Sequence, residues 1–296
     1  MTKSGNTLLI FGCGFSGEAI AARATRRFAA VAGTTRDAVK ADRIRNAGAE
    51  PLVFNGKTVD PELRSRLADA THLLISIAPD ETGDPVLNAL AAAAADLPSL
   101  KWIGYLSTVG VYGDHGGAWV DEETTPAPVS KRSTARLTAE RAWQAYAAGR
   151  AIPLAILRLS GIYGPGRNAF VNIENGTARR LVKPGQVFNR VHRDDIALAA
   201  LLAMEKSAGG IFNITDDEPA PPQDVVAHAC QLAGKMPPPE TDFATAELSP
   251  MARSFYGENK RVSNRKSKAE LGMEYGYPDY RSALARMWRD GSWRVG

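Results

Sequence analysis

Residues 8–21 read LLIFGCGFSGEAIA, an apolar run that leads into the pattern Gly12-x-Gly14-x-x-Gly17 and then into a helical pattern. A strand, a glycine-rich turn and a helix in this order form the phosphate-binding unit of a dinucleotide site. Gly12 permits the tight turn, Gly14 lets the backbone approach a pyrophosphate, and Gly17 allows close helix packing. The free N–H groups at the start of the helix favour an anion. This stretch therefore predicts dinucleotide binding.

Short apolar runs continue to alternate with helical patterns after this unit. The expected helices are residues 15–28, 37–48, 61–70, 88–98 and 130–149, and the expected strands are residues 29–36, 50–55, 71–79, 101–107 and 153–159. Unbroken apolar runs are typical of strands that are covered on both faces. The sequence therefore predicts an α/β fold, in which a doubly wound parallel sheet carries helices on both faces.

The alternation becomes irregular and rich in proline after Gly164. We therefore expect a dinucleotide-binding domain over residues 1–165, with about 186–215 returning to it. A smaller substrate-binding lobe is expected from residues 166–185 and 216–296.

Composition restricts the class of protein. The net charge of +4, from 36 basic and 32 acidic residues, is spread along 296 residues, which argues against a nucleic-acid or membrane partner and favours a phosphorylated small molecule. Cys13 and Cys230 lie far apart without metal-ligand spacing, so no metal site is expected. Two thiols in a chain of this size suggest a reducing compartment, and we expect a cytoplasmic location. The first apolar run is too short for a secretory signal core, and no stretch approaches the ~18–20 apolar residues of a membrane span.

The end of the second expected strand indicates which dinucleotide is bound. An acidic residue there would bond the ribose 2′-hydroxyl, whereas an arginine would meet a 2′-phosphate. The sequence reads GTTRD, so Thr34 and Thr35 are neutral donors and Arg36 supplies a planar cation. Asp37 comes one residue late and is expected to cap the next helix. NADP is therefore expected in preference to NAD, although Arg36 as a solvated surface charge is the alternative.

These residues carry a resemblance to a known family that covers nearly the whole chain. Besides the glycine loop, it rests on YLSTVGVYGD (105–114), DEETTPAP (121–128), LRLSGIYGPGRN (157–168), RVHRDDIALA (190–199), FNITDDEPAP (212–221) and RVSNRKSKAELG (261–272). In order and spacing they resemble the short-chain dehydrogenase/reductase superfamily of the extended type, the branch of NAD-dependent epimerases and dehydratases. The degraded active-site motif resembles its atypical subgroup. The resemblance implies a Rossmann fold and oxidoreductase or epimerase chemistry.

The resemblance also implies a catalytic Ser or Thr, a Tyr and a Lys. Thr108 matches the Ser or Thr, with Ser107 as its fallback. The Tyr-x-x-x-Lys motif should begin eight residues before Glu140, where this sequence has Arg132 and Arg136. A guanidinium stays charged near neutral pH and cannot exchange a proton as a phenol can. Two interpretations stay open: a solvated row of ion pairs along one helix face, or a clamp for an anion.

The missing acid has other candidates. Tyr112 and Tyr163 occupy positions that border the cleft in the family, and each can equally be a tyrosine that anchors a loop. His192 is a further possible proton carrier, or a residue that positions Arg193.

The remaining site residues are implied by the resemblance. The expected cofactor contacts, besides the three glycines and Arg36, are Phe15, Ser16, Thr35, Ile77, Ala78, Pro79, Leu159, Ser160 and Ile162. Gly161 stands where many relatives have an Asn that touches the substrate, which suggests that the substrate is not a standard sugar nucleotide. Arg167, Arg193 and Arg261 are basic candidates for its phosphate or carboxylate.

Two functions are compatible with these features. The first is an NADP-dependent oxidoreductase or epimerase that acts on a small, anionic or sugar-nucleotide-like substrate. The alternative is a non-catalytic NADP-binding redox sensor or regulator, which would tolerate loss of the phenol. The Ala/Leu/Trp face of the helix over residues 130–149 suggests a possible homodimer.

Overall fold

The alternating apolar runs form a seven-stranded sheet in the computed structural model, which describes residues 4–294. The strand order is β11-β7-β5-β4-β1-β2-β3, and every neighbouring pair is parallel. The strands are β1 (Ser4–Phe11), β2 (Phe28–Thr35), β3 (Glu50–Val53), β4 (His72–Ile75), β5 (Trp102–Thr108), β7 (Leu154–Leu159) and β11 (Gly210–Ile214). The predicted α/β fold is confirmed. Residues 1–3 and 295–296, the outer ends of the expected domain ranges, lie outside the described residues.

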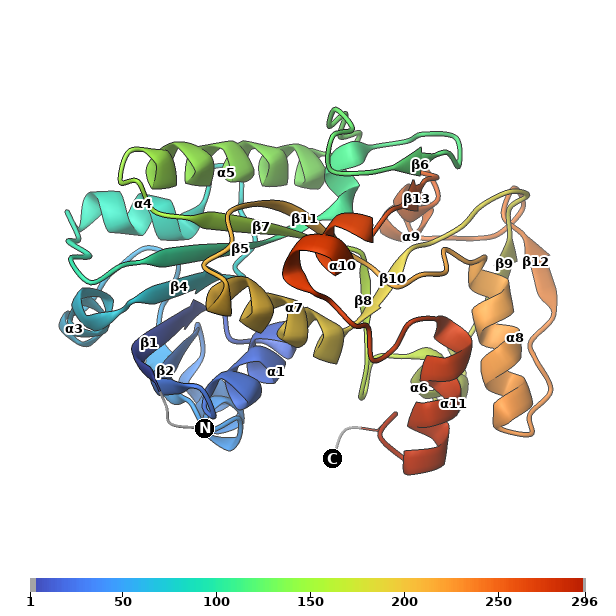
Figure 1. Ribbon diagram of the computed structural model, residues 1–296. Helices are drawn as coiled ribbons and strands as arrows, with labels where there is room; N and C mark the ends of the chain where they lie inside the picture. The colour runs from blue at the N-terminus through green and yellow to red at the C-terminus, as the bar shows by residue number, and fades with distance from the viewer. Residues whose placement is uncertain (1–3, 295–296) are drawn as a thin grey trace.

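Helices cover both faces of the sheet because successive side chains of a strand point to opposite sides. Leu8 and Ile10 of β1 pack in one core with three of the helices, and Leu9 and Phe11 pack in a second core with the other three. The first group is α1 (Phe15–Ala24), α2 (Ala41–Asn46) and α7 (Arg193–Glu205), and the second is α3 (Pro61–Asp69), α4 (Pro85–Ala92) and α5 (Lys131–Ala148). Figure 1 shows α5 and α1 on opposite sides of the sheet.

The sheet reverses its winding direction between β1 and β4. The chain proceeds outward from β1 to β3 on one side and from β4 to β11 on the other. In an open α/β sheet, ligands bind at such a reversal, outside the carboxyl ends of the strands. The glycine loop follows β1 at this place, so the topology positions it beside the loop that follows β4.

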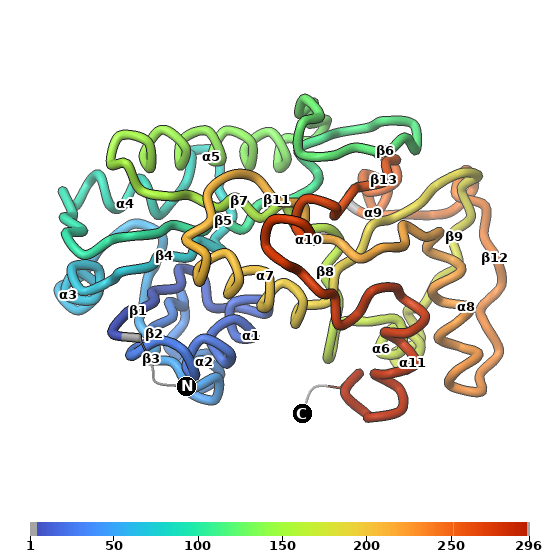
Figure 2. The backbone as a smooth tube through the Cα atoms, in the orientation of Figure 1, coloured from blue at the N-terminus to red at the C-terminus, as the bar shows by residue number. Residues whose placement is uncertain are grey.

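A smaller lobe lies at one end of the sheet, and Figure 2 shows the chain passing between the sheet and this lobe more than once. Its pairs of short parallel strands are β8 (Gly161–Tyr163) with β10 (Arg190–His192), β9 (Arg180–Val182) with β12 (Glu240–Asp242), and β6 (Trp119–Val120) with β13 (Arg261–Val262). Its helices are α6 (Ala169–Glu174), α8 (Pro222–Leu232), α9 (Pro250–Phe255) and α11 (Tyr280–Asp290). The helix α10 (Arg265–Leu271) packs on the sheet instead, with Leu271 in the same core as α1 and α7. Phe170, Ala229 and Leu284 join α6, α8 and α11 in a separate core.

Three expected helices differ from the observed ones by more than one residue at an end. The first ends at Ala24 instead of Phe28, because Phe28 opens β2 and packs edge-on against the ring of His72 at 5.1 Å. The second begins as a 3-10 turn (Ala38–Lys40) before α2. The helix expected over residues 88–98 ends at Ala92. Ala94 has a φ of 44°, in the left-handed region, where a right-handed helix cannot continue.

The face of α5 that suggested a dimer contact is buried in the chain's own core. Leu137, Ala139 and Trp143 are all buried, and Trp143 packs beside Tyr105 of β5. This face was wrongly assigned as a surface for pairing, because the sheet of the same chain covers it.

Candidate functional site

The glycine loop has a geometry that requires glycine for a different reason at each position. Gly12 has a φ of +85°, and a Cβ there would lie 2.8 Å from the Ile77 side chain. A Cβ at Gly17 would lie 3.0 Å from the carbonyl oxygen of Gly12, so only glycine lets α1 approach the loop this closely. Gly14 differs, because a Cβ there would meet nothing within 4 Å. The loop therefore leaves open space at the position where a phosphate group would approach.

The start of α1 is also open to an anion. Its N-cap residue, Gly14, makes no side-chain hydrogen bond to the helix, whereas Ser130 caps α5 and Asp60 caps α3. Phe15 and Ser16 are the first two residues of α1. N–H groups at an uncapped helix start attract negative charge. These residues fit the diphosphate of a dinucleotide.

The end of β2 presents Arg36 as an exposed side chain. Asp37 accepts a hydrogen bond from Val39 N at 2.9 Å and caps the following turn, as predicted. The Thr35 hydroxyl donates to the backbone oxygen of Asp37 at 3.1 Å. The Asp37 carboxylate therefore caps the turn that follows. The exposed Arg36 guanidinium is left as the charged group that can meet a ligand at this strand end.

Arg136 lies at the carboxyl ends of β4 and β5. Its Nη1 donates to the backbone oxygens of Leu106 at 3.0 Å and Ile77 at 3.4 Å, and to the Tyr105 hydroxyl at 3.2 Å. Ile77 also packs against Gly12, so Arg136 reaches the segment beside the glycine loop. Ala78 and Pro79 continue this segment.

Arg132 lies one helical turn earlier, is exposed, and has its guanidinium carbon 5.3 Å from the ring centre of Phe255 in α9. Among residues 4–294, neither Arg132 nor Arg136 forms an ion pair with a carboxylate. The solvated row of ion pairs is therefore not formed. Glu140, which would complete it, is buried and pairs with Arg158 of β7 at 2.8 Å instead.

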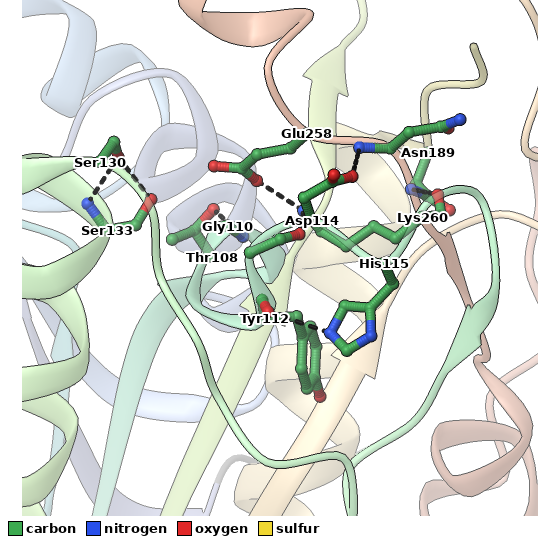
Figure 3. A network of polar contacts seen from close by, with 12 residues as sticks. Thr108, Gly110, Tyr112, Asp114, His115, Ser130, Ser133, Asn189, Glu258 and Lys260 are labelled. Carbon is green, nitrogen blue, oxygen red and sulfur yellow. Dashed lines mark hydrogen bonds and ion pairs between the residues drawn. The ribbon is translucent and has the colours of Figure 1, made fainter.

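The two hydroxyls at the end of β5 have different surroundings. Ser107 is buried and donates to the Glu140 carboxylate. Thr108 is partly exposed, and its Oγ1 accepts from Gly110 N at 3.1 Å. A Cβ at Gly110 would lie 2.8 Å from the hydroxyl of Ser133 and 3.3 Å from that of Thr108, so both hydroxyls flank this glycine. Figure 3 shows Thr108 beside Gly110 in the loop that follows β5.

A buried lysine ties this loop to the C-terminal part of the chain. Lys260 is 6% exposed, and its amino group donates to Gly113 O at 2.7 Å and to the Glu258 carboxylate at 2.6 Å. Asp114 accepts from Asn259 N at 2.7 Å. Figure 3 shows Asp114, Glu258 and Lys260 in this network. Sequence reasoning missed Lys260 and Ser133, because the stretches ENKRV and SKRST carry no recognisable signal. For Arg158 the sequence does carry a signal, because a charged residue within an apolar strand requires a buried partner.

The candidate proton donors lie inside the protein. The Tyr112 hydroxyl donates to the Asn213 side chain at 2.8 Å, and that of Tyr163 is buried without a partner among the described residues. Burial raises the pKa of both phenols. His192 stacks on Tyr277 with 3.6 Å between ring centres, and burial lowers its pKa to about 4, so it is neutral at neutral pH.

Gly161, which stands where many family members have an Asn, follows β7 and lies close to the backbone of Asn189. Gly161 N donates to Asn189 O at 3.0 Å, and a Cβ at Gly161 would also lie 3.0 Å from that oxygen. A longer side chain would need the backbone at Asn189 to move. Leu159 and Ser160 are buried, and Ile162 packs against the core of the sheet, so this segment is held firmly at the strand end.

Arg167 and Arg193 lie beside the glycine loop. Their guanidinium carbons are 5.9 Å and 5.0 Å from the ring centre of Phe15. Arg261 instead donates to Gly117 O, away from this loop.

Comparison with known proteins agrees with this geometry. Residues 82–215 match the model of the NAD dependent epimerase/dehydratase family. Protein YeeZ of Escherichia coli K12 is 30% identical over 285 residues, which cover 91% of this chain and 96% of YeeZ. The chain belongs to the NAD-dependent epimerase/dehydratase family. Among solved structures, a functionally unknown conserved protein from Silicibacter pomeroyi is 46% identical to this chain, with a TM-score of 0.87 over 97% of this chain and 99% of the other.

Two further similarities extend the comparison. The UDP-glucuronic acid 4-epimerase from Bacillus cereus, solved in complex with NAD, shares the fold with a TM-score of 0.74 and 18% identity, over 96% of this chain and 97% of the other. The 3-diazoavenalumate denitrifying reductase of a Streptomyces species is 30% identical over 144 residues. That match covers 44% of this chain and 46% of the reductase, which is less than half of each.

Within residues 4–294, no helix combines the length and apolar character that crossing a bilayer requires. The same residues contain no group of three or more His, Cys, Asp or Glu side chains that are placed to hold a metal ion.

Proposed function

We propose that this protein is an NADP-dependent oxidoreductase that acts on a small, anionic or sugar-nucleotide-like substrate. The observation that carries the proposal is the open, uncapped start of α1 behind Gly14, with Arg136 at the neighbouring strand ends. The nicotinamide would supply or accept a hydride when bound. The chain's own residues would hold the cofactor, and Arg132 and Arg136 would orient the anionic group of the substrate.

The choice of NADP rests on Arg36. It is exposed at the end of β2, and the carboxylate of Asp37 is engaged in capping. A guanidinium can form two parallel hydrogen bonds to the oxygens of a 2′-phosphate, whereas the ribose hydroxyls of NAD carry no negative charge to attract it.

We expect NADPH to bind at least tenfold more tightly than NADH, a difference of about 1.4 kcal/mol. Arg36→Asp should reverse the order, because the new carboxylate repels a 2′-phosphate and accepts from a 2′-hydroxyl. Titration calorimetry with both cofactors measures this. Arg45→Ala, which removes a charge from an exposed helix position nearby, should leave the ratio unchanged. Equal affinities of the wild-type protein for the two cofactors would contradict the preference.

The substrate class rests on the two arginines that stand in place of Tyr and Lys. Neither has a carboxylate partner within residues 4–294, although Arg136 is partly buried. Two cations one turn apart would repel each other and an oxidised nicotinamide, and an anion between them would relieve that repulsion. A neutral, reduced nicotinamide suits this site better, so turnover should run toward reduction.

Replacing both Arg132 and Arg136 by alanine should weaken binding of an anionic probe, UDP-glucuronic acid, at least tenfold. NADPH affinity should change less than about threefold, because the glycine loop is retained. Fluorescence titration of both ligands gives the two numbers. Arg141→Ala, an exposed arginine on the same helix, is the matched control and should change neither. An unchanged affinity for the sugar nucleotide in the double variant would refute the clamp.

One observation favours a second function, that of a non-catalytic NADP-binding redox sensor. The hydroxyls of Tyr112 and Tyr163 are buried, and His192 is neutral in the core, so none presents an acid at the cleft. Incubating the protein with NADPH and a panel of sugar nucleotides, aldehydes and quinones separates the two functions. Oxidation of NADPH above the protein-free rate supports the enzyme, and tight binding without oxidation supports the sensor.

A further inference from the structure

The ring of Phe15 has two arginines near it that come from different parts of the chain. Arg167 follows β8, and Arg193 is the first residue of α7. Their guanidinium carbons lie 5.9 Å and 5.0 Å from the centre of the Phe15 ring. Phe15 itself is the first residue of α1 and directly follows Gly14. Two positive charges therefore converge on the loop that is open to a phosphate group.

The arrangement of helices adds to this positive potential. α1 and α7 both begin here, with Arg193 near the ring of Phe15. The start of α7 is capped by the His192 side chain and carries Asp194 and Asp195, so the helix start that is open to an anion is that of α1. The start of α1 has no side-chain cap. Asp194, in the first turn of α7, is the carboxylate that faces Arg193, and its oxygen lies 3.8 Å from Arg193 Nε, too far for a hydrogen bond.

Arg193 is held in place but is not satisfied. Its stem packs on Gly164, where a Cβ would lie 3.2 Å from Arg193 Cγ. Its Nε is buried and has no hydrogen-bond partner among the described residues. Gly164 also pairs with Arg167, with 3.0 Å between Gly164 N and Arg167 O, so one short loop fixes the positions of both arginines.

We propose that Arg167 and Arg193 bind the diphosphate of the dinucleotide together with the glycine loop, and that they are cofactor residues instead of substrate residues. This inference rests on the proposed function. Guanidinium groups bond phosphate oxygens in a forked geometry, and an anion here would give Arg193 Nε the hydrogen-bond partner that it lacks among the described residues. The site would therefore hold the diphosphate from two sides, the backbone N–H groups of α1 and the two side chains.

The test compares two ligands that differ in the diphosphate. NADPH contains it, and adenosine 2′-monophosphate has the adenosine and the 2′-phosphate but neither phosphate of the diphosphate. We expect Arg167→Ala and Arg193→Ala each to weaken NADPH binding at least fivefold, and the double variant at least tenfold. Binding of adenosine 2′-monophosphate should stay within about twofold, which also shows that the variants are folded. Arg193→Lys should retain part of the NADPH affinity, because it keeps the charge and loses the fork. Arg26→Ala is the control, since this exposed arginine lies just past the other end of α1.

The outcomes are distinct. A double variant that binds NADPH within twofold of the wild-type protein overturns the inference and leaves the proposed function standing. Equal losses for NADPH and adenosine 2′-monophosphate also overturn it, because the arginines would then act on the adenosine, on the 2′-phosphate or on folding. A wild-type protein that binds neither NADPH nor NADH overturns the proposed function and this inference with it.

Discussion

Gly14→Val should reduce the affinity for NADPH at least 100-fold, equivalent to about 2.7 kcal/mol, without unfolding the protein. Gly14 has φ −99° and ψ −150°, an extended backbone outside the positive-φ region that favours glycine. A Cβ there would meet nothing within 4 Å, so the protein itself has room for the side chain. The two methyl groups would occupy the space that the loop leaves for the diphosphate. Fluorescence titration measures the affinity, and circular dichroism monitors the fold.

Gly5→Val is the matched control for this change. Gly5 is exposed in β1, and a Cβ at this position also meets nothing within 4 Å. The variant has the same substitution in equally open space, away from the loop, and it should bind NADPH like the wild-type protein. Unaltered binding in Gly14→Val would mean that the loop does not hold the diphosphate. A parallel loss in both variants would point to a general effect of valine on β1.

The glycine loop was predictable because its roles depend on the backbone. A positive φ at Gly12 and a close approach at Gly17 require glycine whatever surrounds them, so the pattern Gly-x-Gly-x-x-Gly carries the geometry by itself. The capping role of Asp37 was predictable for the same reason, since it depends on the next two residues alone. Local backbone chemistry is visible in sequence.

The surroundings of single side chains were not predictable, because they depend on distant residues. Tyr112 is held by Asn213, 101 positions further along the chain. Arg132, Arg136 and Glu140 share a helical spacing, but Glu140 is withdrawn into the core by Arg158 of β7. The residue spacing along one helix cannot show which of its charged side chains forms an ion pair with a residue of a neighbouring strand. Likewise, Gly161 replaces an expected Asn because the backbone of Asn189 approaches it closely.

Glu140 of α5 and Arg158 of β7 form a buried ion pair that connects the helix to the sheet behind the candidate site. Their side chains are 2% and 3% exposed, and Arg158 donates to both carboxylate oxygens, at 2.8 Å and 3.2 Å. The same carboxylate accepts from Ser107, the residue before Thr108. Removing one member would leave the other charged and unpaired in a medium that solvates charge poorly.

Glu140→Leu should therefore lower the free energy of unfolding by about 3–5 kcal/mol, measured by urea denaturation. The double variant Glu140→Leu with Arg158→Met should recover most of that loss, because no charge is then left buried. Glu50→Ala is the control: its ion pair with Arg66 has a similar distance of 2.7 Å, but the two side chains are 39% and 44% exposed, so its loss should cost no more than about 1 kcal/mol. A small effect of Glu140→Leu, or a double variant less stable than the single one, would show that the pair does not act as a buried unit. Since Ser107 loses its acceptor in both variants, their common effect on NADPH binding also measures how far this carboxylate holds the end of β5 in place.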